Sequence, residues 1–223
     1  VRVSRASAEQ RAGRAGRTAP GVAIRLWNAG QTGALQPYST PEILEADLSG
    51  LLLDCAAFGV AAPSALRFLD SPPSPALAEA RALLTDLGAL GDDGRLTPTG
   101  RAMRQLALPV RLAHMVALAA RRGEANAAAE LAVLLTERGL GGTSVDLDRR
   151  LEAFRRDRGD RAMRARDLAR RLARQAGTGG SEAPSKSPAG NLLLDAWPDR
   201  VGRARGATGH FVLANGRGGV IDP

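Results

Sequence analysis

The stretch SPALAEARALLTDLGALGDDGRLTPTGR, residues 74–101, carries the signals that decide the fold of this chain. Apolar side chains repeat at helical spacing between residues 75 and 87, which predicts an amphipathic helix. The tetrapeptide GDDG at residues 91–94 then has the composition of a tight hairpin turn. Residues 95–100 follow as a short strand that leads into another helix. The stretch therefore predicts a helix, a hairpin and the start of a second helix.

The residues before this stretch predict one more helix, over residues 41–58. Thr40 is the expected N-cap, and the proline that follows it suits the first helical turn. Apolar side chains repeat at helical spacing up to Gly59, which is expected to end the helix. The run SPPSP at residues 71–75 cannot be helical and predicts a rigid connection. Two helices followed by a hairpin form a winged-helix layout, which we assign to residues 37–107.

The one cysteine of the chain, Cys55, lies on the apolar face of the helix predicted over residues 41–58. A reactive thiolate needs a positive and partly exposed setting, so we interpret Cys55 as a core residue. A single cysteine also excludes an internal disulfide, and no cysteine and histidine cluster has the spacing of a zinc site. These features predict a cytoplasmic protein without a metal centre of its own.

The composition favours a mainly helical fold and a polyanionic partner. Hydrophobic residues make up 44% of the 223 residues, enough for a core, but aromatic residues only 3%, so the core must be built from Leu, Ala and Val. The net charge of +8 and a pI near 11.2 indicate nucleic acid as the leading partner, although charge alone does not separate RNA from DNA or a membrane surface. No apolar run reaches the length of a membrane helix, so we expect no membrane insertion.

The second half of the chain predicts a helical bundle over residues 108–176, where apolar positions are dense. Between residues 138 and 174 there are 12 arginines against 6 acidic residues. Two interpretations of this basic stretch stay open: solvated helix faces that keep the bundle soluble, or a surface that holds phosphate groups. The sequence does not identify which arginines would contact a ligand.

The last part of the chain changes composition twice. Residues 177–190 are rich in Gly, Ser and Pro and predict a flexible linker. Residues 191–223 contain short apolar runs separated by glycines, including the run LLL at residues 192–194, and predict a small β-unit that is cut off before it closes. The chain begins without an initiator Met and ends abruptly, so we expect it to be a piece of a longer protein.

An anion-binding motif is predicted near the amino terminus, in QRAGRAGR at residues 10–17. On one continuous helix Gln10, Arg14 and Arg17 would share a face, with Gly13 inside it, and guanidinium groups match phosphate well. The two glycines of the motif suggest the close approach of another backbone or a ligand. Two other interpretations compete: a solvated basic face, and a capping box in which Ser7 caps the helix and Gln10 reaches back to it.

The order of residues in this motif resembles the sixth conserved motif of the DEAH-box RNA helicases. SRASAE precedes the motif, and a Pro-Gly turn with the apolar run VAIRLW follows it. Further matches lie in the expected order: TPEIL, FLDSPP, LGAL and LTPTGR resemble the linker and winged helix of that family, and LPVRLAHM the start of its helical ratchet domain. AWPDR and FVLANGRG resemble the carboxy-terminal region of the HrpB branch.

The resemblance implies a domain order for the whole chain. Residues 1–36 would be the end of a second RecA-like α/β domain, beginning with the end of a strand at residues 1–3 and closing in a loop rich in turn formers. The winged helix (37–107), the ratchet domain (108–176), the linker (177–190) and the start of an HrpB-type carboxy-terminal region (191–223) would follow. The fold class is therefore mainly α.

The resemblance also implies an ATP site and an RNA partner. Arg14 and Arg17 would act as fingers on the γ-phosphate, and Gln10 would position the attacking water or contact the terminal phosphate. Gly13 would lie on the same side of the nucleotide. The substrate would be ATP with Mg²⁺, and the partners would be single-stranded RNA or another nucleic acid and the amino-terminal RecA-like domains of the same polypeptide.

Two motifs of such an enzyme do not occur in the sequence. Neither a G-x-x-x-x-G-K-[ST] phosphate loop nor a DEAH box is found among the 223 residues, so the chain alone is expected to be inactive. The alternative is a non-catalytic winged-helix protein that binds nucleic acid or regulates transcription. The helix over residues 75–87 argues against groove reading, because its one basic residue, Arg81, is set against two acids.

Overall fold

The computed structural model describes residues 3–60, 62–177 and 187–221. Its helices and strands follow one another along the chain as α1 (Arg5–Gly13), α2 (Ala29–Gly33), η1 (Glu42–Leu44), α3 (Ser49–Ala57), η2 (Pro63–Ala65), α4 (Ser74–Asp86), α5 (Pro98–Arg104), α6 (Val110–Arg121), α7 (Ala125–Thr136), α8 (Leu147–Arg156), α9 (Asp160–Gln175), α10 (Ala189–Ala196), η3 (Pro198–Arg200), β1 (Gly202–Ala204), β2 (His210–Leu213) and β3 (Gly218–Val220). The mainly helical fold with a small sheet confirms the predicted fold class.

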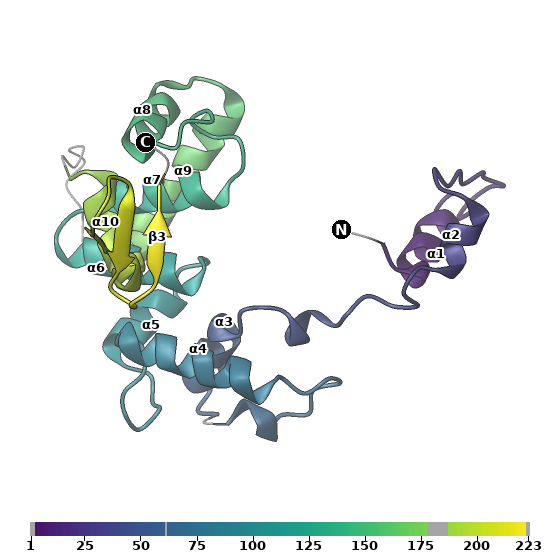
Figure 1. Ribbon diagram of the computed structural model, residues 1–223, viewed down its shortest axis with the longest axis horizontal. Helices are drawn as coiled ribbons and strands as arrows, with labels where there is room; N and C mark the ends of the chain where they lie inside the picture. The colour runs from purple at the N-terminus through teal and green to yellow at the C-terminus, as the bar shows by residue number, and fades with distance from the viewer. Residues whose placement is uncertain (1–2, 61, 178–186, 222–223) are drawn as a thin grey trace.

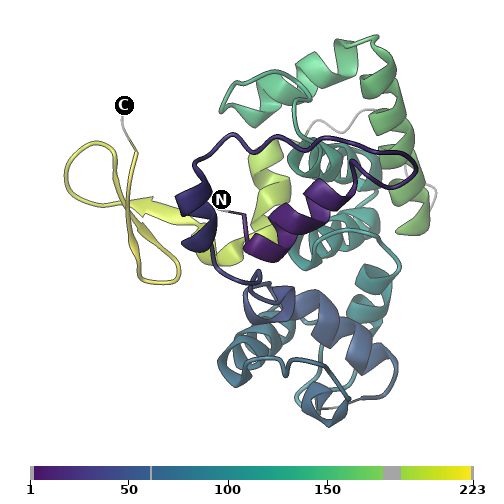
Figure 2. The ribbon, with the colours of Figure 1, turned by 90° about the vertical axis from the view of Figure 1, so that its right-hand side faces the viewer.

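The elements form a body of stacked helices and one separate piece. Figure 1 shows α3, α4 and α5 at one end of the body and α8 and α9 at the other, with α6, α7 and α10 between them. The first two helices stand apart and are joined to α3 by an extended segment. The view in Figure 2 shows the small sheet projecting from the body beyond α10.

The stretch at residues 74–101 folds as predicted except for the strand predicted over residues 95–100, because residues 98–100 already belong to α5. The helix α4 spans Ser74–Asp86, so each of its ends lies one residue before the predicted limits of 75 and 87. A β-bridge joins Leu90 to Leu96 across the GDDG turn, so the predicted hairpin is confirmed. Thr97 then caps α5, because its hydroxyl accepts a hydrogen bond from the Gly100 N–H at 3.0 Å and donates one to the Gly88 carbonyl at 2.6 Å.

The helix predicted over residues 41–58 is wrong in its first half. Pro41, not Thr40, is the N-cap of the short 3₁₀ turn η1, and the α-helix α3 begins only at Ser49. The break falls at Asp47, whose carboxylate accepts a hydrogen bond from the Ser49 N–H at 2.8 Å and so competes with helical hydrogen bonding. The predicted end is confirmed, since Gly59 follows α3 with a φ of 79°.

The interpretation of Cys55 as a core residue is confirmed. Its side chain is buried with a relative exposure of 5%. Burial raises the pKa of the thiol, and the charge of the neighbouring Asp54 raises it further. The thiol is therefore in the setting of an inert residue and not of a nucleophile.

The helical bundle is closed by a helix that we did not predict. The helix α10 packs against α6, while α7 packs against both α6 and α9. The side chains of Leu192 and Ala196, four residues apart, are buried in this contact, so the prediction of a β-run at residues 192–194 is wrong.

The start of α10 corrects the end of the predicted linker. The helix begins at Ala189, whose N–H donates to the Asp148 carboxylate at 2.9 Å, so the last two residues of the range 177–190 are helical. Residues 178–186, which make up most of the predicted linker, lie outside the described residues.

The predicted β-unit is present as a three-stranded antiparallel sheet with the order β1-β2-β3. Arg203 lies opposite Val212 in the first pair of strands, and Val212 lies opposite Gly218 in the second. The strand that we predicted at residues 1–3 falls mostly outside the described residues, because only Val3 is included. Over residues 3–60, 62–177 and 187–221, no helix has the length and apolar character needed to cross a membrane.

Candidate functional site

The helix α1, which carries the start of the QRAGRAGR motif, begins earlier than we predicted. Its N-cap is Ser4, whose hydroxyl accepts a hydrogen bond from the Ser7 N–H at 3.2 Å. The predicted capping box of Ser7 and Gln10 is therefore wrong, since Ser7 already lies within the helix. Gln10 has no capping role and points its side chain to solvent, so the interpretation that competed with a functional Gln10 is removed.

Residues 33–39 hold the first turn of α1 in place. The backbone N–H of Arg5 donates to the Gln36 carbonyl at 2.8 Å, and its guanidinium group donates to the Gly33 carbonyl at 3.0 Å. The Ser39 hydroxyl donates to the Ser4 hydroxyl at 3.1 Å, and Ser4 has a relative exposure of only 5%. The amino-terminal end of α1 is thus fixed from two sides, while the end that carries the motif is exposed.

The motif is not one continuous helix. The helix α1 ends at Gly13, and Arg14 is its C-cap with backbone angles still in the right-handed helical region. Arg17 lies three residues further on, outside the helix, so the predicted face shared by Gln10, Arg14 and Arg17 is wrong for Arg17. Gly13 and Gly16 both disfavour the helical conformation. The helix therefore ends at Gly13, and the chain continues as a turn.

The turn that carries Arg17 is closed by a glycine outside the motif. A Cβ atom placed on Gly21 would lie only 1.8 Å from the Ala15 carbonyl oxygen. By contrast, a Cβ on Gly13 or Gly16 would meet nothing within 4 Å. No other part of the described chain therefore needs the two motif glycines to be small.

The three predicted side chains of the site are free. Gln10, Arg14 and Arg17 are exposed, and within the described residues their side chains have no hydrogen-bond or ion-pair partner. No acidic residue occurs between positions 10 and 17. The structure thus presents unneutralised guanidinium donors on an open surface, with one helical turn between Gln10 and Arg14 and a loop between Arg14 and Arg17.

An apolar row follows the motif, and the sequence analysis did not recognise its pattern. Val22, Ile24 and Leu26 alternate along an extended segment and are 86%, 81% and 93% exposed. Apolar residues at every second position are typical of a strand that buries one of its faces. Trp27 ends the row half-buried and donates to the Thr32 hydroxyl at 3.1 Å.

The loop predicted after this row contains a helix. Asn28 is the N-cap of α2, and the Asn28 N–H donates to the Gln31 side-chain carbonyl at 3.2 Å. The turn formers that we assigned to an irregular loop therefore build one short helical turn, because Asn at the N-cap and Gln three residues later satisfy each other.

The described residues contain no group of three or more His, Cys, Asp or Glu side chains that could hold a metal ion. A cluster of carboxylates that could hold Mg²⁺ is therefore not found near the motif in this part of the chain.

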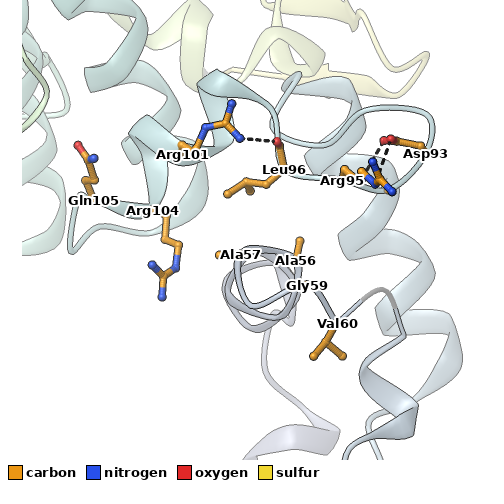
Figure 3. A pocket seen from close by; sticks show the side chains of 11 residues that line it. Ala56, Ala57, Gly59, Val60, Asp93, Arg95, Leu96, Arg101, Arg104 and Gln105 are labelled. Carbon is orange, nitrogen blue, oxygen red and sulfur yellow. Dashed lines mark hydrogen bonds and ion pairs between the residues drawn. The ribbon is translucent and has the colours of Figure 1, made fainter.

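A cleft of about 920 Å³ lies between the end of α3, the hairpin turn and α5 (Figure 3). Its three arginines are engaged in contacts within the chain. Arg101 donates to the Leu96 carbonyl at 3.1 Å, and Arg95 lies 3.6 Å from the Asp93 carboxylate. Arg104 pairs with Asp54 at 3.0 Å and stacks over the Phe58 ring. Arg95 and Arg104 therefore have carboxylate partners, Arg101 has a backbone carbonyl as its partner, and we assign no ligand to the cleft.

The comparison with known proteins agrees with the fold and the motifs. Residues 80–110 match the family model described as the helicase associated domain (HA2), winged-helix. The chain is 41% identical over 221 residues to the ATP-dependent RNA helicase HrpB of Escherichia coli K12, which covers 99% of this chain and 26% of that protein. It is also 41% identical over 116 residues to the probable ATP-dependent RNA helicase DHX34 of human, over 52% of this chain and 10% of that protein.

A solved structure gives the same result at the level of the fold. The crystal structure of the Escherichia coli DEAH/RHA helicase HrpB superposes with a TM-score of 0.76 at 37% identity, covering 100% of this chain and 27% of that chain. The chain spans about a quarter of the length of HrpB.

These results confirm the predicted family resemblance. The chain is similar in sequence and fold to the carboxy-terminal region of the helicase HrpB, and residues 80–110 match the winged-helix helicase associated domain. Among the proteins compared it is close to HrpB, and the match covers 99% of this chain and 26% of HrpB.

Proposed function

We propose that this chain acts as part of an ATP-dependent RNA helicase that couples NTP hydrolysis to translocation on, or unwinding of, nucleic acid. The observation that carries the proposal is the pair of unpartnered arginines, Arg14 and Arg17, in a motif without acidic residues. The similarity to HrpB over 99% of the chain supports the same conclusion.

The proposed role of the motif is to stabilise charge during phosphoryl transfer from ATP. Arg14 and Arg17 each present planar N–H donors that match phosphate oxygens bidentately. Such donors, aimed at the γ-phosphate, stabilise the charge that develops as the bond to it breaks, and one arginine finger contributes roughly 10³ to 10⁵ in rate. The Gln10 amide would hold the attacking water or the terminal phosphate, and the bare backbone at Gly13 would leave room for the nucleotide.

The motif supplies only one side of that site. The sequence contains neither a phosphate loop nor a DEAH box, and no cluster of carboxylates that could hold Mg²⁺ is found among the described residues. We therefore propose that this chain alone does not hydrolyse ATP, and that RecA-like domains outside these 223 residues complete the site. The exposed apolar row at residues 22–26 would be covered by those domains.

The proposed second partner is single-stranded RNA. The net charge of +8 favours a polyanion, and twelve arginines lie between residues 138 and 174. A cytoplasmic location is part of this proposal and rests on the use of a single, buried cysteine.

The proposed role of the motif is tested with Arg14→Ala and Arg17→Ala in the protein made from its complete reading frame. We expect each change to lower RNA-stimulated ATP turnover at least about 100-fold, because an arginine finger is lost, while RNA affinity stays within a factor of two. Arg67→Ala removes an exposed arginine outside the motif and outside the apolar row and is the matched control. Undiminished turnover in both motif variants would refute the assignment.

The alternative is a non-catalytic winged-helix protein that binds or regulates nucleic acid. It predicts binding without any ATP turnover, even when the complete reading frame is expressed. It has less support, because α4 places Arg81 beside Glu79 and Asp86 and so presents no basic reading face.

A further inference from the structure

The first turn of α1 is capped by carbonyl groups from a later part of the chain. The N–H groups at the start of a helix have no partner within the helix, so they need acceptors from elsewhere. In α1 the Arg5 N–H donates to the Gln36 carbonyl at 2.8 Å, and the Ala6 N–H donates to the Pro37 carbonyl at 3.0 Å. The start of α1 is therefore held by the segment that leads from α2 towards α3 (Figure 1).

Ser39 adds a side-chain contact to this capped end. Its hydroxyl donates to the hydroxyl of Ser4, the N-cap of α1, at 3.1 Å. Ser4 is buried whereas Ser39 is exposed, so the contact joins the cap of the helix to the surface. The Ser4 hydroxyl also accepts from the Ser7 N–H. A change at Ser39 therefore acts on the cap of α1 without removing a core side chain.

The same segment is anchored in the helical body four residues after Ser39. Ile43, in η1, is partly buried and packs against the core cluster that includes Leu52 of α3. Pro41 lies between the two contacts, and its ring restricts the backbone there. Four residues of fully extended chain span at most about 14 Å, so the connection between the two contacts is short. Residues 39–43 thus join the start of α1 to the core of the winged-helix part.

The other end of α1 carries two of the side chains proposed for the ATP site. Gln10 lies in the last turn of α1 and Arg14 is the C-cap, and both are exposed. At 1.5 Å per residue, Arg14 lies roughly 13 Å along the helix from Arg5. A tilt of about 5° at the capped end therefore moves Arg14 by about 1 Å. A displacement of this size at a reacting group can cost roughly 100-fold in rate.

We propose that residues 39–43 form a tether through which the winged-helix core sets the direction of α1, and that Ser39 is a positioning residue for Arg14. This role rests on the proposed function, in which Arg14 acts on the γ-phosphate of ATP. Ser39 acts through Ser4 and the cap of α1 and does not itself contact the nucleotide. The tether gives the ATP site a mechanical connection to the domain that follows it.

A plain flexible linker fits these contacts less well. Such a linker behaves as a random coil and makes no lasting bonds to the elements that it joins. Here residues 33–39 are bonded to the start of α1 through backbone and side-chain groups, and the Arg5 guanidinium group adds a bond to the Gly33 carbonyl at 3.0 Å. The core contact of Ile43 then follows within four residues.

The test uses the protein made from its complete reading frame, with two sets of matched variants. Ser39→Ala removes the hydroxyl that bonds to Ser4, Ser39→Thr keeps it, and Ser64→Ala is the control at another exposed serine. A Gly-Gly insertion between residues 40 and 41 lengthens the tether. The same insertion between residues 92 and 93, in the exposed hairpin turn, is its control. The kcat and KM for ATP are measured at saturating RNA.

We expect Ser39→Ala to lower kcat about threefold to tenfold and to leave KM within about twofold, because an arginine finger acts in the transition state. Ser39→Thr should keep kcat within about twofold, since it restores the hydroxyl. The tether insertion should lower kcat roughly tenfold, whereas both controls should change it less than about twofold. An unchanged kcat in Ser39→Ala, an equal loss in Ser39→Thr, or equal effects of the two insertions would overturn the proposal.

Hydrogen exchange separates a failure of the tether from a failure of the proposed function. The Arg5 and Ala6 amides are protected by their bonds to residues 36 and 37, so their exchange rates report this contact without any ATP turnover. We expect Ser39→Ala to speed exchange over residues 5–8 about threefold or more, and Ser64→Ala to leave it unchanged. If the unaltered protein never hydrolyses ATP in response to RNA, the proposed function is wrong. Unchanged exchange in Ser39→Ala would overturn the tether in either case.

Discussion

The bundle of α6–α10 and the segment around α1 differ in what their side chains contact. In the bundle, Phe154 and Met115 are fully buried, and Arg122 pairs with both Asp195 and Glu124. The hydrogen bond that Arg122 donates to the Asp195 carboxylate is the largest cause that raises the pKa of Arg122, so the fold stabilises this charge. In the segment around α1, the side chains of Arg14 and Arg17 have no partner among the described residues, and the apolar row beside them is more than 80% exposed.

The two regions differ in whether their arginines and apolar side chains find partners within the chain. Every arginine of α6 and most of those in α8 have a partner supplied by the chain. The motif arginines and the apolar row have none, although their sequence is the most specific signal in the chain. The contacts of the side chains therefore indicate whether a site is complete. The specificity of a sequence motif does not indicate this.

The largest expected effect is on the bundle core. Phe154→Ala removes a fully buried ring against which Arg166 also packs, and we expect the free energy of unfolding to fall by about 3–5 kcal/mol. Chemical denaturation followed by circular dichroism measures this change. Val145→Ala, at a position 98% exposed, serves as the control and is expected to stay within about 0.5 kcal/mol. A cost below about 1 kcal/mol for Phe154→Ala would contradict the closed core.

A smaller loss is expected at the winged helix. Gly100→Ala would place a Cβ atom 2.3 Å from the Ala89 carbonyl oxygen, so backbone must shift, and we expect a cost of about 2 kcal/mol. Gly50→Ala is the matched control, because this exposed glycine of α3 has nothing within 4 Å of the added atom. It is expected to stabilise α3 by up to about 1 kcal/mol, through lower backbone entropy in the unfolded state. Equal effects of the two changes on the melting temperature would show that the contact at Ala89 does not limit residue size.

The smallest effect on stability, and the sharpest test of the comparison, is expected at Gly13. Gly13→Ala adds an atom where the chain has no neighbour within 4 Å, so stability should change by less than about 1 kcal/mol, in the favourable direction. In the protein made from its complete reading frame, ATP turnover should nevertheless fall about tenfold or more, because a small displacement at a reacting phosphate is costly. Unchanged turnover would mean that nothing approaches Gly13 in the complete site.

The parts of the fold that the sequence predicted correctly are those whose signals are local. The limits of α4, the hairpin at residues 91–94 and the stop at Gly59 depend on helical periodicity and on residue types that favour one backbone conformation. The wrong helix starts came from neighbouring side chains that compete for the backbone N–H groups at the start of a helix. Asp47 ends the early helix by bonding to the Ser49 N–H, and Ser4 takes the capping role that we had given to Ser7.

Other features depended on distant contacts and could not be predicted from local signals. The run at residues 192–194 is helical as part of α10, which packs against α6 and whose first N–H, that of Ala189, donates to Asp148, 41 residues away in the chain. The partners of several arginines also lie on other elements, as with Arg155 of α8 and Glu130 of α7. For the QRAGRAGR motif, the sequence did not predict the end of the helix at Gly13.

The contact between Gly21 and Ala15 links two parts of the amino-terminal segment that have different tasks. Gly21 is the first residue of the extended run that holds Val22, Ile24 and Leu26, and Ala15 begins the turn that holds Arg17. Because the two backbones touch, a displacement of the apolar run is transmitted directly to the turn. A partner that packs on that run would therefore also shift the turn that holds Arg17.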